Sequence, residues 1–197
     1  IDSFYTILLE EFGDLEKDLK VSVKEADLPG HTMDDESQRR LLNSLTCCPH
    51  GAIAWSKEMD NLVETSTNLA SVKFIDNYKI EIVTTQRSSI ESSKYDVAAM
   101  VESCLGLAGA EVTHSEGYPG WRPNINSEIL KITQKSYRKL FGREPDIRAI
   151  HAGLECGLIY KKFKGIDMIS IGPTIRGAHT PEEKIEIKTT QMFWDLL

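Results

Sequence analysis

A turn-rich segment near the middle of the chain, Gly117-Tyr118-Pro119-Gly120-Trp121-Arg122-Pro123, constrains the fold more than any other feature. Its prolines fix φ and remove backbone donors, and its glycines adopt conformations that other residues avoid. Helices and strands rarely continue through a segment of this kind. We therefore expect a rigid connector and a domain boundary, which divides the chain into residues 1–116 and residues 117–197.

The first part begins with two expected helices. Apolar residues at three- and four-residue steps predict a helix over residues 2–19, although Gly13 weakens it. The alternation at Val21-Ser22-Val23 is typical of a short strand. Asp34 or Asp35 is a suitable cap for a second helix that stops before Pro49.

A β-hairpin is expected after a polar stretch over residues 50–68, which we expect to be irregular. Residues 69–74 and 78–84 have the composition of strands, and they are joined at Asp76-Asn77, where both residues tolerate positive φ. Apolar and polar residues alternate in the second strand, so one face of the hairpin should be buried.

A helix that starts at Ser92 or Ser93 and closes at Gly109 should follow the hairpin, and residues 110–116 are typical of another strand. The order helix, strand, hairpin, helix, strand matches a ferredoxin-like unit whose first strand lies before residue 1. The chain also begins at Ile1 rather than Met, so we expect it to be cut from a longer protein.

The second part has an α/β rhythm in which strands and helices alternate, with at least two strands expected to be parallel. The fold class is therefore α/β overall, with an α+β first part. The expected elements are a helix over 127–141 capped by Asn126 and closed by Gly142, a strand over 147–151, a short helix over 153–160, a strand over 168–172 and a helix from Pro181 to the end.

Composition excludes several functions. Lys and Arg number 23 against 30 Asp and Glu, a net charge of −7, which argues against nucleic acid as a partner. No apolar run approaches 18 residues, so we expect no membrane association. The four cysteines form no CxxC pair, which favours a reduced, cytoplasmic protein.

One candidate site is the segment His151-Ala152-Gly153-Leu154-Glu155-Cys156-Gly157, at the carboxyl end of an expected strand. In open α/β sheets ligands bind at such ends, and glycine lets the backbone approach a ligand closely. The residues alone leave an alternative open, since the same glycines suit a tight strand-to-helix turn with no ligand. Cys156 has no neighbouring base and is interpreted as a small buried residue.

Two further side chains are candidates for chemistry. His179 lies in the long loop after the last expected strand, where it suits a metal ligand, a general base or a surface histidine that caps a turn. Arg87 ends a strand, where it suits either a bidentate clamp on a carboxylate or a solvated charge. No local spacing of ligands marks a self-contained metal site.

Together these segments resemble a known family. The motifs His-Ala-Gly-Leu-Glu-Cys-Gly (151–157), Ser-Ile-Gly-Pro-Thr-Ile-x-Gly-x-His-x-Pro-x-Glu (170–183) and Gly-Tyr-Pro-Gly-Trp-x-Pro (117–123) resemble the aminoacyl-histidine dipeptidases, or Xaa-His dipeptidases, of metallopeptidase family M20. Val-Glu-Thr-Ser-x-Asn-Leu (63–69) fits the same family. The resemblance spans the chain and is strong from residue 60 onward.

The resemblance implies a cytoplasmic enzyme more than twice this long, with two bridged zinc ions, a dipeptide substrate and a homodimer formed through a ferredoxin-like lid domain. Residues 1–116 resemble the later part of the lid, and residues 117–197 resemble the last part of the catalytic domain. His179 matches the last metal ligand, Arg87 the arginine that binds the substrate carboxylate, and Gly153 the glycine whose backbone meets the substrate. No residue of this chain matches a catalytic base.

Three hypotheses follow for the function. The first is the carboxy-terminal portion of a two-metal dipeptidase, the second another M20 exopeptidase such as a tripeptidase, and the third a binding or dimerisation module without catalysis. Catalytic zinc normally takes three protein ligands, and His179 is one. We therefore expect the isolated chain to be inactive.

Overall fold

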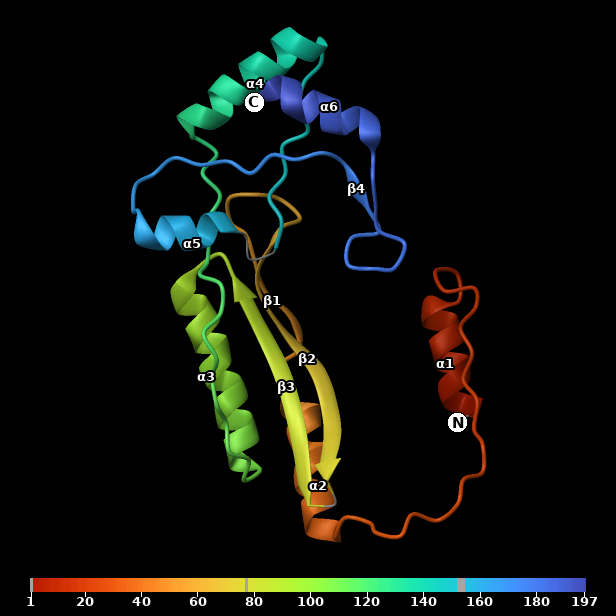
Figure 1. The fold of residues 1–197 in the computed structure, drawn as a ribbon. Helices are drawn as coiled ribbons and strands as arrows, with labels where there is room; N and C mark the ends of the chain where they lie inside the picture. The colour runs from red at the N-terminus through yellow and green to blue at the C-terminus, as the bar shows by residue number, and fades with distance from the viewer. Residues whose placement is uncertain (1, 77, 152–154) are drawn as a thin grey trace. The chain divides into compact units, whose positions relative to one another are not determined.

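The computed structural model describes residues 2–76, 78–151 and 155–197. These residues form two compact units, which cover residues 1–34 and 35–197 (Figure 1). The boundary expected near residue 116 lies within the second unit, and it stays a prediction. Each unit is described separately.

The first unit contains one helix, α1 (Asp2–Phe12), which is shorter than expected. The helix ends where Gly13 places its N–H 2.9 Å from the Leu9 carbonyl oxygen, with no side chain to stabilise a further turn. The chain then folds back, and the Tyr5 hydroxyl donates to the Leu19 carbonyl oxygen at 3.1 Å. The expected helix over 2–19 is therefore wrong beyond Phe12.

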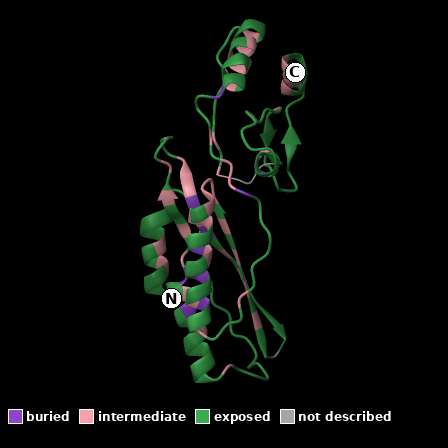
Figure 2. Cartoon of the chain, turned by 90° about the vertical axis from the view of Figure 1, so that its left-hand side faces the viewer, coloured by how far each residue is buried: buried purple, intermediate pink, exposed green. Residues whose placement is uncertain are grey.

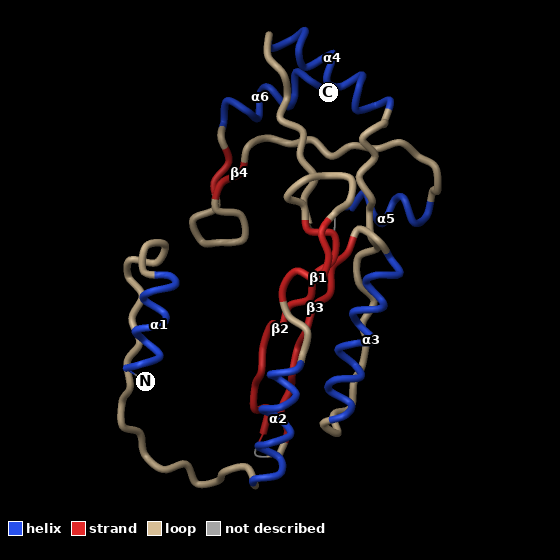
Figure 3. The backbone as a smooth tube through the Cα atoms, turned by 180° about the vertical axis from the view of Figure 1, so that it is seen from behind, coloured by secondary structure: helices blue, strands red, loops and turns tan. Residues whose placement is uncertain are grey.

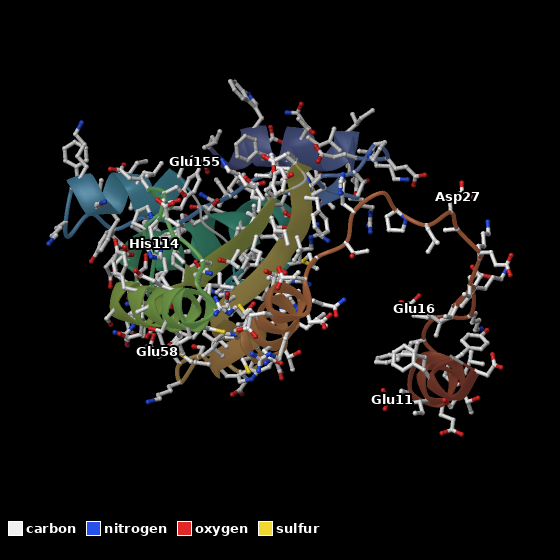
Figure 4. All side chains as sticks on the ribbon, turned by 90° about the horizontal axis from the view of Figure 1, so that it is seen from below. Glu11, Glu16, Asp27, Glu58, His114 and Glu155 are labelled. Atoms are coloured by element: carbon white, nitrogen blue, oxygen red, sulfur yellow. The ribbon has the colours of Figure 1, made fainter. Side chains whose placement is uncertain are left out.

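The rest of this unit is irregular and acidic. The strand expected at residues 21–23 does not form, because this segment pairs with no strand among the described residues. Glu11, Glu16 and Asp27 are exposed, and Figure 4 shows them along this unit. Solvated acidic side chains therefore occur along this unit.

The second unit is built on an antiparallel sheet of β1 (Gly51–Trp55), β2 (Val63–Asp76) and β3 (Lys79–Ser88), in the order β1-β2-β3. The expected hairpin is confirmed, since Asp76 pairs with Lys79 and the Asp76 carboxylate accepts the Tyr78 N–H at 2.7 Å. The two long strands run side by side in Figures 1 and 3.

The polar stretch 50–68 is not irregular, because it contains β1 and the first residues of β2. Thr65 and Thr67 are only 1% and 2% exposed, although threonine is polar. The Thr65 hydroxyl bonds the Ser88 hydroxyl at 2.8 Å, and the Gln86 amide donates to the Thr67 hydroxyl at 3.1 Å. Cross-strand hydrogen bonds thus allow polar residues to lie in a buried strand.

Two helices cover the sheet. They are α2 (Asp35–Cys47) and α3 (Glu91–Leu107), close to the expected bounds. The core consists of Cys48, Val101 and Leu105, and it is extended by Leu69, Ile82, Cys104 and Val112 from both layers. Figure 2 shows the buried residues gathered where the helices meet the strands.

Three further strands were expected, over residues 110–116, 147–151 and 168–172, and none forms. Figure 3 draws all three segments as loops. A strand exists only through hydrogen bonds with a neighbour, and the sheets of the described residues offer these segments none. The apolar composition of these segments is therefore not sufficient to predict a hydrogen-bonded strand.

Helix α4 (Glu128–Phe141) forms as expected, except that Ser127 replaces Asn126 as its cap. The Ser127 hydroxyl accepts the Leu130 N–H at 3.1 Å, and Gly142 ends the helix with φ of 68°. The short helix α5 spans Glu155–Lys162, and α4 packs against α6 (Ile187–Leu196).

The last helix begins six residues later than expected. Between Pro181 and Ile187 the chain instead forms β5 (Lys184–Ile185), which pairs antiparallel with β4 (Ile175–Arg176). The Glu186 N–H donates to the Thr174 carbonyl oxygen at 2.9 Å and closes this hairpin before the helix starts. All strand pairs among the described residues are antiparallel, so the expected parallel pair is wrong.

The mixed helix and sheet class is confirmed. All four cysteines are free thiols. Within the described ranges, no helix combines the length and apolar character that a bilayer crossing requires.

The core of α3 should dominate the stability of the second unit. Leu105 is 5% exposed, so Leu105→Ala should lower the free energy of unfolding by about 2–4 kcal/mol through lost burial and a cavity. Leu107 on the same helix is 91% exposed, and Leu107→Ala should change it by less than about 0.5 kcal/mol. Urea unfolding followed by circular dichroism measures both, and equal effects would contradict the core assignment.

Candidate functional site

A cavity of about 400 Å³ lies in the second unit, where the end of β3 meets the connector and two later loops. Its walls come from segments far apart in the sequence. The side chains that matter for its chemistry are Arg87, Lys94, His151 and His179. The cavity therefore brings together two of the three site residues that the sequence analysis selected.

The connector is held against β3 by a close backbone contact. A Cβ atom on Gly120 would lie 2.8 Å from the Ser89 carbonyl oxygen and 2.9 Å from that of Ser88, closer than real Cβ atoms approach oxygen. On the other side, a Cβ atom on Gly157 would lie 2.8 Å from the Pro119 carbonyl oxygen. Both positions require glycine, so the connector is packed between β3 and α5.

Side chains from the start of α3 fix the same connector. The Glu91 carboxylate accepts the Gly120 N–H at 2.8 Å, and it pairs with the Lys94 ammonium at 2.7 Å. Lys94 also donates to the Tyr118 carbonyl oxygen at 3.1 Å. Burial alone would raise the pKa of Glu91, but the Lys94 and Gly120 contacts outweigh it and lower that pKa, so the carboxylate is ionised at neutral pH.

Arg87 is placed by its position on β3. It lies opposite Ser66 of β2 in the strand register, on the face of β3 that the helices do not cover. Its guanidinium forms no hydrogen bond or salt bridge with any residue that the structure describes. An exposed arginine with unused donors in a cavity wall is suited to bind a planar anion such as a carboxylate.

His151 lines the cavity together with the connector and contacts β2 directly. Its Nε2 atom is 2.6 Å from the Ser66 hydroxyl oxygen. Burial lowers the pKa of the imidazole and the positive charge of Arg87 lowers it further, while a hydrogen bond with the Val63 backbone opposes both. The ring is therefore neutral at neutral pH.

His179 occupies a tight turn between β4 and β5. Its φ of 65° lies in the left-handed region, which is uncommon for a residue with a side chain. Its backbone N–H donates to the Glu183 carboxylate at 2.8 Å, and this bond holds the turn. Among the residues that the structure describes, no group forms a hydrogen bond with the imidazole, and His179 lines the cavity.

The remaining candidates are less informative. Gly153 lies outside the described residues. Glu155 opens α5, where it is exposed and visible in Figure 4, and Cys156 beside it is a partly buried free thiol. Across the described part of the chain, no three His, Cys, Asp or Glu side chains converge to hold a metal ion.

Sequence reasoning did not identify the partners of these residues. Ser66 lies in the motif that fits the family but carried no role, and Lys94 had no local signal at all. The contact between His151 and Ser66 joins positions 85 residues apart, which no local pattern reveals.

Comparison with known proteins shows the family of the chain. The family model described as peptidase family M20/M25/M40 matches residues 1–193. The chain is 36% identical, over its whole length, to the cytosol non-specific dipeptidase of Escherichia coli K12. Its fold resembles the crystal structure of an aminoacylhistidine dipeptidase from Vibrio alginolyticus, with a TM-score of 0.83 and 37% identity over 99% of this chain.

The chain belongs to peptidase family M20/M25/M40. It spans 40% of the length of the Escherichia coli protein and 40% of the Vibrio chain. The resemblance seen in the sequence motifs is thereby confirmed at the level of the family.

The glycine at position 120 should be essential for seating the connector. Gly120→Ala should lower the free energy of unfolding by about 1–3 kcal/mol, because its methyl group meets backbone oxygen atoms that cannot move freely. Gly117→Ala in the same connector is the matched control, since no atom lies within 4 Å of its added Cβ. Urea unfolding compares the two variants, and equal stability would show that the close contact does not hold the connector.

Proposed function

We propose that this chain forms part of the active site of a metal-dependent dipeptidase and supplies the clamp for the substrate carboxylate together with one metal ligand. One observation carries the proposal. Arg87 and His179 lie 92 positions apart in the sequence, yet both line the same cavity. Membership of a peptidase family supports hydrolysis of a peptide bond as the reaction.

Arg87 supports the first role. A dipeptide ends in a carboxylate, and a guanidinium presents two parallel N–H donors that match its two oxygen atoms. No acidic side chain among the lining residues competes for that charge. A substrate carboxylate bound here would keep the rest of the dipeptide in the cavity that His179 also lines.

His179 supports the second role. Neutral imidazole is a common zinc ligand, and the ring nitrogens of His179 are not used by any described residue. Since the described residues contain no group of three ligands, the chain fits zinc only as a contributor to a shared site. When bound, a pair of such ions lowers the pKa of a shared water molecule and polarises the scissile carbonyl.

The chain's own residues would bind, orient and enclose the substrate. Arg87 would hold the carboxylate, and the connector between Pro119 and Trp121 closes one wall. The family resemblance gives Gly153 the role of the glycine whose backbone meets the substrate. The family resemblance matches no residue of this chain to the base that accepts a proton from water. We infer that the chain alone is inactive, because His179 by itself does not hold catalytic zinc.

The proposal extends to the substrate and the setting of the whole protein. The two relatives are named as a cytosol dipeptidase and an aminoacylhistidine dipeptidase, which supports a cytoplasmic enzyme acting on dipeptides, including those that end in histidine. We also propose that residues 1–116 contribute to a lid and a homodimer contact, as the resemblance implies.

Removing the clamp should weaken substrate binding. In the complete dipeptidase that carries this chain, Arg87→Ala should cost about 1.5–3 kcal/mol of charge-assisted binding, which raises KM for β-alanyl-histidine about 10- to 100-fold. Arg138→Ala is the matched control, since Arg138 of α4 is paired with Glu144 and lies outside the cavity. Steady-state kinetics measures both, and an unchanged KM for Arg87→Ala would reject the clamp.

Removing the imidazole should affect the metal rather than the carboxylate. His179→Ala in the complete protein should abolish turnover and release zinc during dialysis, as measured by atomic emission. His114→Ala is the control, because His114 is exposed and bonded to Glu102 at 3.1 Å on α3. Full zinc retention in the His179 variant would contradict the assignment while leaving the role of Arg87 intact.

A further inference from the structure

We infer that His151 is a positioning residue which, through Ser66, fixes the place where Arg87 receives the substrate carboxylate. Neither the resemblance nor the relatives assign a role to either residue. The inference rests on the proposed function, because it assumes that Arg87 binds a carboxylate. It concerns how that arginine is held rather than whether it acts.

The contact on which the inference depends is short and specific. His151 Nε2 lies 2.6 Å from the Ser66 hydroxyl oxygen, and the ring also bonds the backbone of Val63. Both contacts are with β2, so the ring is fixed against one strand at two points. A side chain held in this way is ordered before any ligand arrives, which lowers the entropic cost of binding.

The position of Ser66 connects this contact to Arg87. The two residues are directly opposite each other in the β2–β3 register, where their side chains lie on the same face of the sheet. Arg87 and His151 both line the cavity, and the positive charge of Arg87 lowers the pKa of the imidazole. The ring is therefore held on β2 beside the position opposite Arg87.

The chemistry of the neighbour matters as much as its position. A carboxylate beside Arg87 would neutralise the charge of the guanidinium. A cationic side chain there would repel the guanidinium and would itself compete for the substrate carboxylate. Since burial and Arg87 keep the imidazole uncharged, His151 limits the movement of the guanidinium without taking its charge. The full positive charge then remains for the ligand.

A purely structural role makes a different prediction from a positioning role. His151 lies in the later part of the chain and Ser66 in the earlier part, so their bond could serve only to join the two. In that case its loss would reduce stability or turnover irrespective of Arg87. If the pair acts through Arg87, its loss should appear in KM and should vanish once Arg87 is absent.

The test uses the complete, metal-loaded dipeptidase and β-alanyl-histidine as the substrate. His151→Ala and Ser66→Ala should each raise KM about fivefold, the value of one hydrogen bond, with kcat changed by less than about twofold. The double variant should be no worse than either single variant, because both remove the same contact. His151→Gln, which retains a hydrogen-bonding group, should recover part of the loss.

Two controls make the result specific. Ser71→Ala lies on the same strand outside the cavity, and it should leave KM unchanged. In an Arg87→Ala background, His151→Ala should have no further effect on KM. Ser66→Ala keeps the test valid if His151→Ala does not fold, since alanine fits a strand position that already holds a small side chain.

Other outcomes overturn the inference. An unchanged KM in Ser66→Ala, a fall in kcat alone, or the same rise in KM with and without Arg87 would each show that the pair does not act through the arginine. Failure of the proposed function is distinguishable, because then Arg87→Ala itself would leave KM unchanged. In that case the clamp and the positioning role are both rejected.

Discussion

The close backbone contact between Gly120 and the end of β3 is the constraint on which the rest of the site depends. Because no Cβ atom fits between Gly120 and the carbonyl oxygens of Ser88 and Ser89, the connector lies directly on the strand that carries Arg87. The Glu91 carboxylate bonds the Gly120 N–H and fixes this seating from α3. His151 and His179, which both follow the connector in the sequence, line the same cavity as the connector and Arg87.

The charges around the cavity are arranged so that one cation stays available. Lys94 is paired with Glu91 and donates to the Tyr118 carbonyl oxygen. Its charge is therefore used to hold the connector in place. Arg87 has no such partner among the described residues, and His151, which lines the same cavity, is kept neutral. A cavity with one unpaired guanidinium favours a ligand with one carboxylate, which agrees with the end of a peptide.

How much the sequence predicts depends on whether an element is stabilised locally. The hairpin at Asp76 and the helices α2, α3 and α4 are fixed by turns, caps and apolar spacing, and the predictions for them hold. The segments 110–116 and 168–172 have strand composition but no partner in the described sheets, so their extended character does not make a strand. Arg87 and His179 were selected by resemblance, whereas the bond from His151 to Ser66 joins distant positions and needs the folded chain.

The residues proposed to bind the substrate and the residues needed to bind metal differ in how many groups must converge, and this difference determines what a chain of this extent can contain. On the proposed function, Arg87, the connector and the neutral imidazole of His151 would act on the substrate carboxylate, and all of them lie within residues 35–197. Metal chemistry needs several ligands that converge, and the described residues contain no group of three. The proposed role of His179 as one contributor to a shared metal site rests on this absence and on its place in the cavity wall. On that proposal, substrate orientation depends on contacts inside this chain, while activation of the water needs ligands beyond His179.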